Sequence, residues 1–375
     1  MVYLDYSATT PTNNDVLDSF IKSSKEFIGN PNSLHELGVK SMNIIESASK
    51  QIANLLNVNI NEIIYTSGAS ESNNLAIKGI CENYKNRGKH IITTPLEHSS
   101  VYGPIDYLKE LGYKVDYVKI DQQGLVDLQD LKKLINEDTI LVSINAVNSE
   151  IGIVQPIEEI AKIIKEYPKC FFHSDMTQAI GKINININNV DLISFSAHKF
   201  YGIKGIGVLI KKEKIELTPI IHGGKSTTIY RSGTPCTPLI ISISKALRLA
   251  LTDLDKKYNY IKELNQYLKE ELIKFNKVRI NSNDKCIPHI LNISILGVKP
   301  ETMQHALEKY EIYVSTKSAC SDANSKSKAV FALTNNNEIS SSSIRISLSH
   351  LNTKEEVKYF LYKFKICYEE LTNLR

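Results

Sequence analysis

The chain has 375 residues, a formal net charge of +4, and 42% hydrophobic and 23% charged residues. This composition is that of an ordinary globular protein and excludes a disordered or fibrous chain, while the length suggests two domains. Because 45 basic residues nearly balance 41 acidic ones, the charge gives no reason to expect direct binding to nucleic acid or to an anionic membrane.

No apolar run approaches the roughly 18 residues that a membrane span needs. The first residues also lack a basic segment followed by an apolar one, so we expect a cytoplasmic protein without membrane association. The cysteines are too far apart for CxxC zinc or thioredoxin-type motifs, and we expect most of them to be buried thiols. They are Cys81, Cys170, Cys236, Cys286, Cys320 and Cys367.

Short apolar runs alternate with helical patterns between about residues 60 and 212. The runs are nearly continuous, as in strands that are covered on both faces. The expected strands span residues 62–66, 90–94, 114–118, 139–144, 170–174, 191–195 and 206–210, and two intervening helices span 128–135 and 157–165. The alternation predicts a mostly parallel sheet with helices on both sides.

The pattern changes after about residue 240. A long helical stretch from 239 to 275 precedes isolated strands at 290–295, 312–314 and 344–348 and helices at 300–310 and 353–372. This predicts a smaller α+β domain, formed by residues 1–14 and 246–375, beside a large domain of residues 15–245. Two stretches rich in Ser and Asn, at 321–328 and 335–343, predict mobile loops.

Several residues that could carry chemistry directly follow predicted strands, where open α/β sheets bind their ligands. Gly68 permits a tight turn, after which the amides of Ala69 and Ser70 open a helix and could bind an anion. A strand–glycine–helix junction is more often only a turn. His98 and Asn148 follow two further strands, but a lone loop histidine is usually a surface residue or a helix cap, and Asn148 could simply be a turn asparagine before a glycine.

An acid and a lysine end two other strands. Burial of Asp175 is costly without a partner, so it could hold a metal, cap a helix or pair with a cation. Lys199 precedes a glycine-rich stretch, and poor hydration there would lower its pKa and make its amine nucleophilic. Such a pair is what a pyridoxal-phosphate site requires. The pattern Ser-x-His-Lys-x-x-Gly favours this reading over a surface lysine in a turn.

Two residues of the C-terminal region complete the set of candidates. Cys320 follows a predicted strand and heads a polar loop, where Lys317 favours its thiolate form. Arg345 lies within a short predicted strand and needs an anionic partner. That partner is either a structural carboxylate or the carboxylate of a substrate.

The chain resembles the NifS/IscS group of cysteine desulfurases, which are fold-type I pyridoxal-phosphate enzymes of the class V aminotransferase superfamily. Each matching segment is weakly specific, but the segments occur in one order along nearly the whole chain. They are residues 3–11, 29–33, 65–74, 97–98, 147–152, 175–178, 196–199, 231–234, 318–321 and 343–347.

The resemblance implies a role for each central residue. Lys199 would bind the cofactor as a Schiff base and move protons, and Asp175 would pair with the ring nitrogen. His98 would stack on the ring and act as an acid or base. Cys320 would attack the sulfur of L-cysteine, leaving L-alanine and a persulfide on Cys320.

Further residues receive binding roles from the same resemblance. Gln178 and Asn148 would form hydrogen bonds near the ring hydroxyl and the substrate. Arg345 and Asn30 would bind the substrate carboxylate. The phosphate would be held by Ala69, Ser70, Ser196 and His198, and by Thr234 of a second subunit. No metal is expected, apart from transient ligation of an iron–sulfur cluster by Cys320.

We therefore expect a homodimer that passes persulfide sulfur to an acceptor protein, either an iron–sulfur scaffold or a tRNA-thiolation enzyme. Two alternatives remain open. A selenocysteine lyase, or another class V lyase or aminotransferase, would use Lys199 and Asp175 without needing Cys320. A catalytically silent sulfur-carrier subunit would keep the fold and lack turnover.

Overall fold

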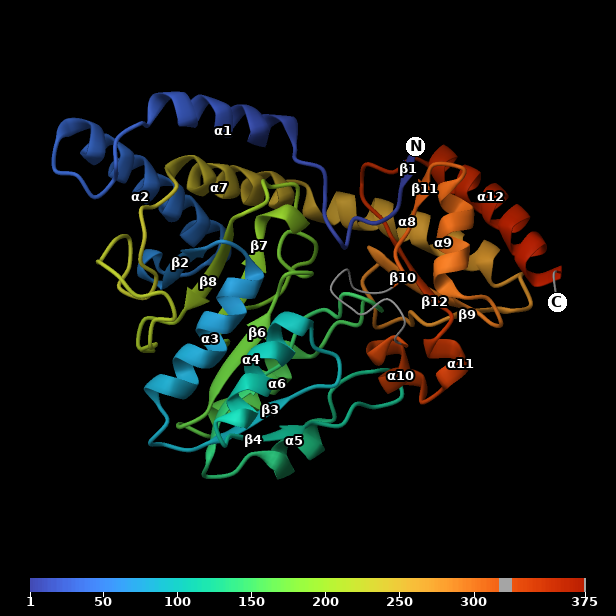
Figure 1. Cartoon of the computed structure of the whole chain (residues 1–375), viewed down its shortest axis with the longest axis horizontal. Helices are drawn as coiled ribbons and strands as arrows, with labels where there is room; N and C mark the ends of the chain where they lie inside the picture. The colour runs from blue at the N-terminus through green and yellow to red at the C-terminus, as the bar shows by residue number, and fades with distance from the viewer. Residues whose placement is uncertain (317–325, 374–375) are drawn as a thin grey trace.

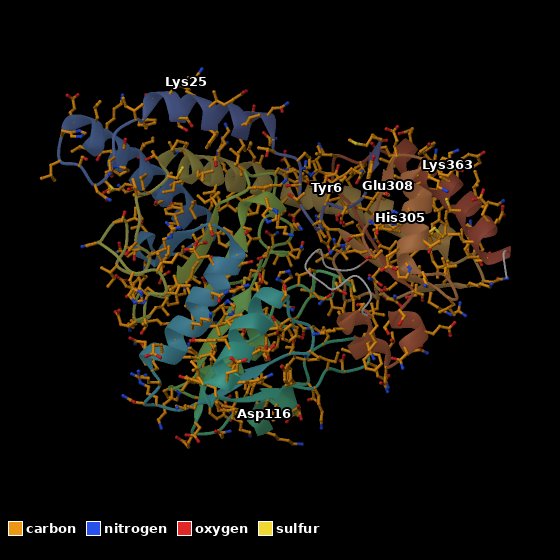
Figure 2. All side chains as sticks on the ribbon, in the orientation of Figure 1. Tyr6, Lys25, Asp116, His305, Glu308 and Lys363 are labelled. Atoms are coloured by element: carbon orange, nitrogen blue, oxygen red, sulfur yellow. The ribbon has the colours of Figure 1, made fainter. Side chains whose placement is uncertain are left out.

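A computed structural model of the chain describes residues 1–316 and 326–373. These residues form a larger lobe, built around a sheet, and a smaller lobe that holds both ends of the chain (Figure 1). Tyr6 is buried where the lobes meet, and Lys25 is exposed on the far side of the larger lobe (Figure 2).

The larger lobe contains a seven-stranded sheet in the order β2-β8-β7-β6-β5-β3-β4. Its strands are β2 (Ile63–Thr66), β3 (His90–Thr93), β4 (Lys114–Tyr117), β5 (Thr139–Ser143), β6 (Phe171–Asp175), β7 (Leu192–Ser196) and β8 (Gly207–Lys211). β8 is antiparallel to both neighbours, and every other pair is parallel. The predicted mostly parallel sheet is thus confirmed.

Helices cover both faces of this sheet. Successive residues of its strands point to opposite faces, and apolar residues on both faces must be buried. Ile91 and Leu141 pack toward one group of helices, and the next residues, Ile92 and Val142, pack toward the other. The first group is α3 (Ala69–Asn83) and α4 (Ser99–Glu110), and the second is α2 (Glu36–Leu56), α5 (Leu128–Leu134), α6 (Ile157–Lys165) and α7 (Thr237–Leu251). Helix α1 (Asn14–Glu26) packs against α7 (Figure 1).

The smaller lobe has its own hydrophobic core. An antiparallel sheet in the order β12-β10-β9 packs against helices, and the N-terminal strand β1 pairs with β11 in parallel. The strands are β1 (Val2–Tyr3), β9 (Val278–Ile280), β10 (Ile290–Ile295), β11 (Ile312–Tyr313) and β12 (Ser343–Ser347). The helices are α8 (Leu254–Leu272), α9 (Pro300–Glu308), α10 (Lys328–Thr334), α11 (Asn337–Ser340) and α12 (Lys354–Asn373).

The long helix expected over residues 239–275 is in fact two helices. α7 ends before Thr252, which is extended, and Asp253 adopts a left-handed conformation with φ of 52°. The apolar pattern continues on both sides of this break and therefore does not reveal it. Because α7 packs in the larger core and α8 in the smaller one, we propose that the lobes divide at residues 252–253, rather than at 245, which lies inside α7.

The two expected loops have different outcomes. Residues 335–343 contain α11 and the first residue of β12, because the Asn336 side chain accepts a hydrogen bond from the Ile339 amide and so starts a helix. The stretch 321–328 falls mostly outside the described residues. Within the described part of the chain, no helix is both long and apolar enough to cross a bilayer.

Candidate active site

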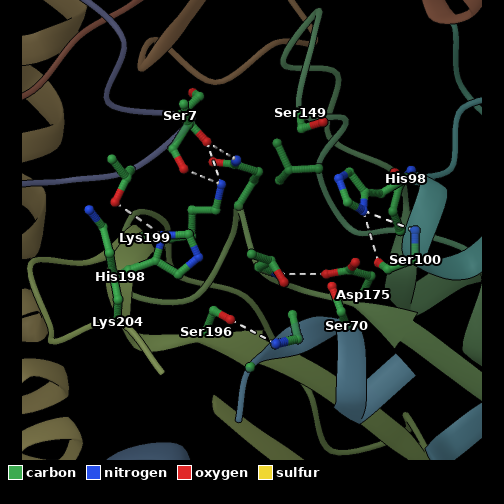
Figure 3. Close-up of a pocket in the computed structure, with 18 of the residues that line it drawn as sticks. Ser7, Ser70, His98, Ser100, Ser149, Asp175, Ser196, His198, Lys199 and Lys204 are labelled. Carbon is green, nitrogen blue, oxygen red and sulfur yellow. Dashed lines mark hydrogen bonds between the residues drawn. The ribbon is translucent and has the colours of Figure 1, made fainter. Parts of the chain in front are cut away.

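A cavity of about 550 Å³ opens at the carboxyl ends of β2, β6 and β7 (Figure 3), and residues 7–9 and Arg345 also line it. Its size suits a small-molecule ligand. Most of the residues predicted from the sequence line it together. They are Ala69, Ser70, His98, Asp175, Gln178, Ser196, His198, Lys199 and Arg345.

One wall of the cavity is the tight turn between β2 and α3. The Ala69 amide at the start of α3 donates a hydrogen bond of 2.7 Å to Ser196 Oγ at the end of β7. Gly207 allows this close approach, since a Cβ at that position would lie 2.6 Å from the Gly68 Cα. The turn and the positive end of the α3 dipole form an arrangement that can bind an anion.

His198 lies beside this wall as a neutral side chain. Its pKa is lowered to about 4, mainly by burial and also by the nearby Lys199 and Lys204 ammonium groups. Its Nδ1 lies 3.2 Å from the Thr9 hydroxyl. An imidazole held in this way contributes hydrogen bonds to the cavity without adding a charge.

Asp175 ends β6 as a buried carboxylate at the floor of the cavity. Its Oδ2 accepts a hydrogen bond of 2.8 Å from the Asn73 amide, and its Oδ1 accepts one of 3.0 Å from the Thr177 backbone. The Asn73 amide also donates to Ser100 Oγ, which lies 2.8 Å from His98 Nδ1. Hydrogen bonds through Asn73 and Ser100 therefore link Asp175 to His98, and Figure 3 shows the Ser100–His98 end of this chain.

The tautomer of His98 follows from its contacts. Nδ1 accepts the Ser100 backbone N–H at 3.1 Å, which assigns the proton of the neutral ring to Nε2. Burial lowers the pKa of His98, and the negative charge of Asp175 opposes this effect. The structure therefore presents a neutral imidazole, able to donate from Nε2.

Lys199 extends from the short helix η2 (Ala197–Lys199), directly after β7, into the cavity. Its Nζ donates hydrogen bonds to the Ser7 and Ala8 carbonyls at 2.7 and 2.8 Å. The Gln178 amide donates to the same Ser7 carbonyl at 2.9 Å. The amine is thus held inside the cavity by the segment that crosses from the smaller lobe to the larger one (Figure 3).

Arg345 is the contribution of the smaller lobe, from the buried strand β12. Its Nη2 lies 2.8 Å from Asp5 Oδ1, and its Nη1 donates to the Ser149 carbonyl at 2.9 Å. Its Nε is buried and has no hydrogen-bond partner among the described residues. Arg345 therefore retains donor capacity for an anionic ligand.

Four predicted residues are not among those that line the cavity. Asn148 is buried, its Oδ1 accepts two backbone N–H groups of the following loop, and its Nδ2 donates to the Leu96 carbonyl. Asn30 and Thr234 are exposed elsewhere on the larger lobe. Cys320 lies outside the described residues. The roles of all four remain predictions.

Several residues that line or support the cavity have no role that the sequence predicts. Ser7, Ala8 and Thr9 contact Lys199 or His198, although residues 3–11 were recognised only as a matching segment. Asn73 and Ser100 join Asp175 to His98. Asn73 is also in a matching segment, but only its position on the inner face of α3 reveals this contact.

The chain matches the protein family described as "Aminotransferase class-V" over residues 2–360. It belongs to this family. "Cysteine desulfurase IscS" of Dictyoglomus turgidum is 39% identical over 378 residues, covering 100% of this chain and 96% of the relative. "Cysteine desulfurase, mitochondrial" of Saccharomyces cerevisiae is 40% identical over 365 residues, covering 96% of this chain and 73% of the relative.

Solved structures agree with these relatives. A structure titled "NIFS-LIKE PROTEIN" has a TM-score of 0.92 and 37% identity, and the match covers 99% of both chains. Another, titled "SspA in complex with cysteine", has a TM-score of 0.83 and 31% identity, covering 94% of this chain and all of that one. The resemblance to the NifS/IscS group and the fold-type I architecture are confirmed.

Class V aminotransferases and cysteine desulfurases depend on pyridoxal phosphate, and the residues of the cavity fit that cofactor. The cavity combines an anion-binding turn, a buried carboxylate and a lysine amine. Two of its buried polar atoms, Arg345 Nε and Thr177 Oγ1, have no partner among the described residues. Such atoms are satisfied when a polar ligand fills the space.

Proposed function

We propose that this class V enzyme is a cysteine desulfurase that converts L-cysteine to L-alanine and forms a persulfide on Cys320. The observation that carries the proposal is the joint presence of the Lys199 amine, the buried Asp175 carboxylate and the Arg345 guanidinium in one cavity. The curated relatives named as cysteine desulfurases, which match nearly the whole chain, support it.

Pyridoxal phosphate, when bound, supplies an electron sink for a carbanion at the substrate Cα. Lys199 would provide the amine for its covalent attachment, and the Asp175 carboxylate would stabilise a proton on its ring nitrogen. The first turn of α3, with Ser196 and His198, would bind its phosphate, because these groups offer N–H and O–H donors and the positive end of a helix.

The substrate is oriented and deprotonated by side chains on opposite sides of the cavity. The Arg345 guanidinium binds the carboxylate of L-cysteine from the smaller lobe. The Lys199 amine, held in the cavity by the Ser7 and Ala8 carbonyls, would remove and return the proton at the substrate Cα. His98 Nε2 holds a further proton. Hydrogen bonds of Asn73 and Ser100 link the neutral His98 ring to Asp175.

The predicted role of Cys320 is supported by the described residues on either side of it. Ser315 pairs with the backbone of Arg345, and the Ser327 hydroxyl donates to Glu150 Oε2 at 2.6 Å. Both anchors adjoin cavity-lining residues, Arg345 and Ser149. In the proposed step, Cys320 Sγ attacks the substrate sulfur, an S–S bond forms as the C–S bond breaks, and the carbon skeleton takes up a proton to become alanine.

The homodimer and the sulfur acceptor are also part of this proposal. Asn30 and Thr234 are exposed outside the cavity, which is compatible with a site completed across two subunits. Apolar side chains are also exposed on α1, α2 and the loop between them, and a second copy would cover them. They are Leu17, Ile21, Ile28, Leu34, Leu37 and Val39.

The acceptor is either an iron–sulfur scaffold or a tRNA-thiolation enzyme, and the relatives named IscS favour the scaffold. The cytoplasmic location is proposed on the same basis.

Light scattering of the purified holoenzyme tests the proposed dimer by giving its mass in solution. A monomer at micromolar concentration would refute the dimer.

The test of the function compares the wild-type holoenzyme with Cys320→Ala and a control, Cys236→Ala, which removes a thiol that is exposed to solvent. We expect Cys320→Ala to keep the cofactor absorbance and to lose at least 100-fold in the release of sulfide and alanine from L-cysteine. Cys236→Ala should keep the wild-type rate. Full activity of Cys320→Ala would refute the mechanism, and retained turnover of selenocysteine alone would indicate a selenocysteine lyase.

A further inference from the structure

Lys182 is a buried lysine to which the mechanism above gives no role. It lies in the turn that follows β6, and only 7% of its surface is exposed. Its Nζ donates a hydrogen bond to Gln178 Oε1. Because burial of an amine is costly unless a partner satisfies it, this contact is the key to what the side chain does.

The backbone after β6 brings the side chains of Gln178 and Lys182 together. The Ile183 N–H donates to the Ala179 carbonyl at 3.1 Å, as in one turn of a helix. Residues four positions apart lie next to each other on such a turn. The Lys182 amine therefore meets the end of the Gln178 side chain within the same short segment.

Two contacts decide which end of the Gln178 amide is the oxygen. Its Nε2 donates to the Ser7 carbonyl at 2.9 Å, and its Oε1 accepts from Lys182. A rotation of the amide by 180° would place an oxygen against the Ser7 carbonyl and a nitrogen against the Lys182 amine. The amide therefore has one stable orientation, with its nitrogen on the side of Ser7.

The Ser7 carbonyl is shared with the lysine that is proposed to bind the cofactor. Lys199 Nζ donates to it at 2.7 Å and to the Ala8 carbonyl at 2.8 Å. A carbonyl oxygen has two lone pairs, so it can accept from Gln178 and Lys199 together. A hydrogen-bonded path through Gln178 and Ser7 therefore connects Lys182 to the Lys199 amine.

We propose that Lys182 is a positioning residue that holds the Gln178 amide on the Ser7 carbonyl and thereby keeps the Lys199 amine in place for proton transfer. Its effect on catalysis rests on the proposed function. The second N–H of Gln178 Nε2 has no acceptor among the described residues, and Gln178 lines the cavity. With its Oε1 occupied by Lys182, Gln178 offers a ligand a donor rather than an acceptor.

Positive charges lie around Lys182. Its pKa is lowered well below its usual range, mainly by burial and also by the Lys199 ammonium and the Arg345 guanidinium. The N–H groups of an amine donate whether or not the amine carries a charge. The contact with Gln178 Oε1 therefore needs a hydrogen-bond donor at position 182 and does not depend on ionisation.

The first test measures the bound cofactor in the absence of substrate. Lys182→Met keeps an unbranched stem and removes the donor, so the Gln178 amide loses the contact that fixes it, and the dichroism of bound pyridoxal phosphate should fall. Lys257→Met is the matched control, because Lys257 is a half-buried lysine that donates to the Leu249 and Thr252 carbonyls at the end of α7. It should keep the wild-type signal. An unchanged signal in Lys182→Met would overturn the proposal, whatever the enzyme does with L-cysteine.

The second test is a double-mutant cycle with L-cysteine as the substrate. Lys182→Met should lower kcat about tenfold and leave KM within about twofold, because the Lys199 amine is displaced and the binding of the substrate carboxylate is not. In a Gln178→Ala background the same substitution should change kcat by less than about twofold, since its effect passes through Gln178. Equal effects in both backgrounds, or a loss confined to KM, would contradict the role.

A further variant keeps the proposal testable if Lys182→Met does not fold. In Gln178→Glu the carboxylate can accept from Lys182 and cannot donate to the Ser7 carbonyl. We expect the same loss of about tenfold in kcat, because the Ser7 carbonyl is then no longer held. A wild-type kcat in Gln178→Glu would overturn the proposal.

Discussion

The carboxylate of Asp5 lies 2.8 Å from Nη2 of Arg345, although 340 positions separate the two residues in the chain. Asp5 belongs to the segment that leaves β1, and Arg345 is fully buried in β12. The pair fixes the direction of the guanidinium at the boundary of the two lobes. It also compensates a buried positive charge, which is costly to leave unpaired.

Substitutions of Asp5 should distinguish the effect of its negative charge from its effect on the orientation of the Arg345 guanidinium. Asp5→Asn keeps an oxygen acceptor for Nη2 but removes a negative charge that competes with the substrate carboxylate. We expect the free energy of unfolding to fall by about 1–3 kcal/mol, while the KM for L-cysteine does not rise. Asp5→Ala also loses the acceptor, so its KM should rise about tenfold, or about 1.4 kcal/mol.

Steady-state kinetics and urea unfolding measure these two effects. Glu308→Gln is the control, because Glu308 pairs with His305 on the exposed surface and should change neither quantity by much. A rise in KM for Asp5→Asn as large as that for Asp5→Ala would show that the charge itself is required for binding.

The turn before α3 provides a second prediction. In Gly207→Ala the new Cβ would meet the Gly68 Cα at 2.6 Å and the Phe195 carbonyl oxygen at 2.7 Å, and backbone atoms cannot move away freely. We expect a loss of about 1–3 kcal/mol in unfolding free energy and weaker binding of pyridoxal phosphate. Denaturation curves and cofactor titrations measure both.

Gly103→Ala is the matched control for this substitution. Gly103 lies in α4 with no atom within 4 Å of the position of its new Cβ, so the change should stabilise the protein by about 0.5–1 kcal/mol through helix propensity. Equal behaviour of the two variants would mean that the contact between Gly207 and Gly68 does not restrain the turn.

The third prediction concerns stability in acid. The pKa of His198 is lowered to about 4 in the folded chain, against about 6.5 in the unfolded chain. Between these values the unfolded state binds more protons, so stability is full above pH 6.5 and falls as the pH drops toward 4. In cofactor-free protein, His198→Gln should lose less of its urea midpoint between pH 6.5 and 4 than the wild type. An equal loss in both proteins would show that His198 is not a source of the acid sensitivity.

Much of the larger lobe was predictable because its signals are local. Strand β5 carries the apolar run Ile140, Leu141 and Val142, β6 begins with two phenylalanines, and β7 carries Leu192, Ile193 and Phe195, as cover on both faces of a parallel sheet requires. Asp175 and Lys199 stand where two such runs end, and the carboxyl ends of parallel strands meet at one edge. Their presence in one cavity was therefore implied by their positions along the chain.

The limits of local pattern are seen in three places. Apolar residues recur at helical spacing on both sides of Asp253, so this spacing does not reveal the break between α7 and α8. Asn148 is predicted to bind near the ligand, and nothing in its segment indicates that its amide is also bonded to its own loop and to Leu96. Glu97 Oε1 accepts the Asn145 backbone N–H although the two residues are 48 positions apart, and nothing in either segment indicates the other.

The amino-acid sequence by itself thus determined which segments become strands, which reactive residues terminate them, and to which family the chain belongs. Tertiary structure alone decided that the Ser7 and Ala8 carbonyls hold Lys199, that Asp5 orients Arg345, and which buried atoms find no partner among the described residues. The physical reason is that burial of a strand face depends on neighbouring residues. A hydrogen bond between distant segments depends instead on how two packed elements meet, and no short stretch of sequence encodes that.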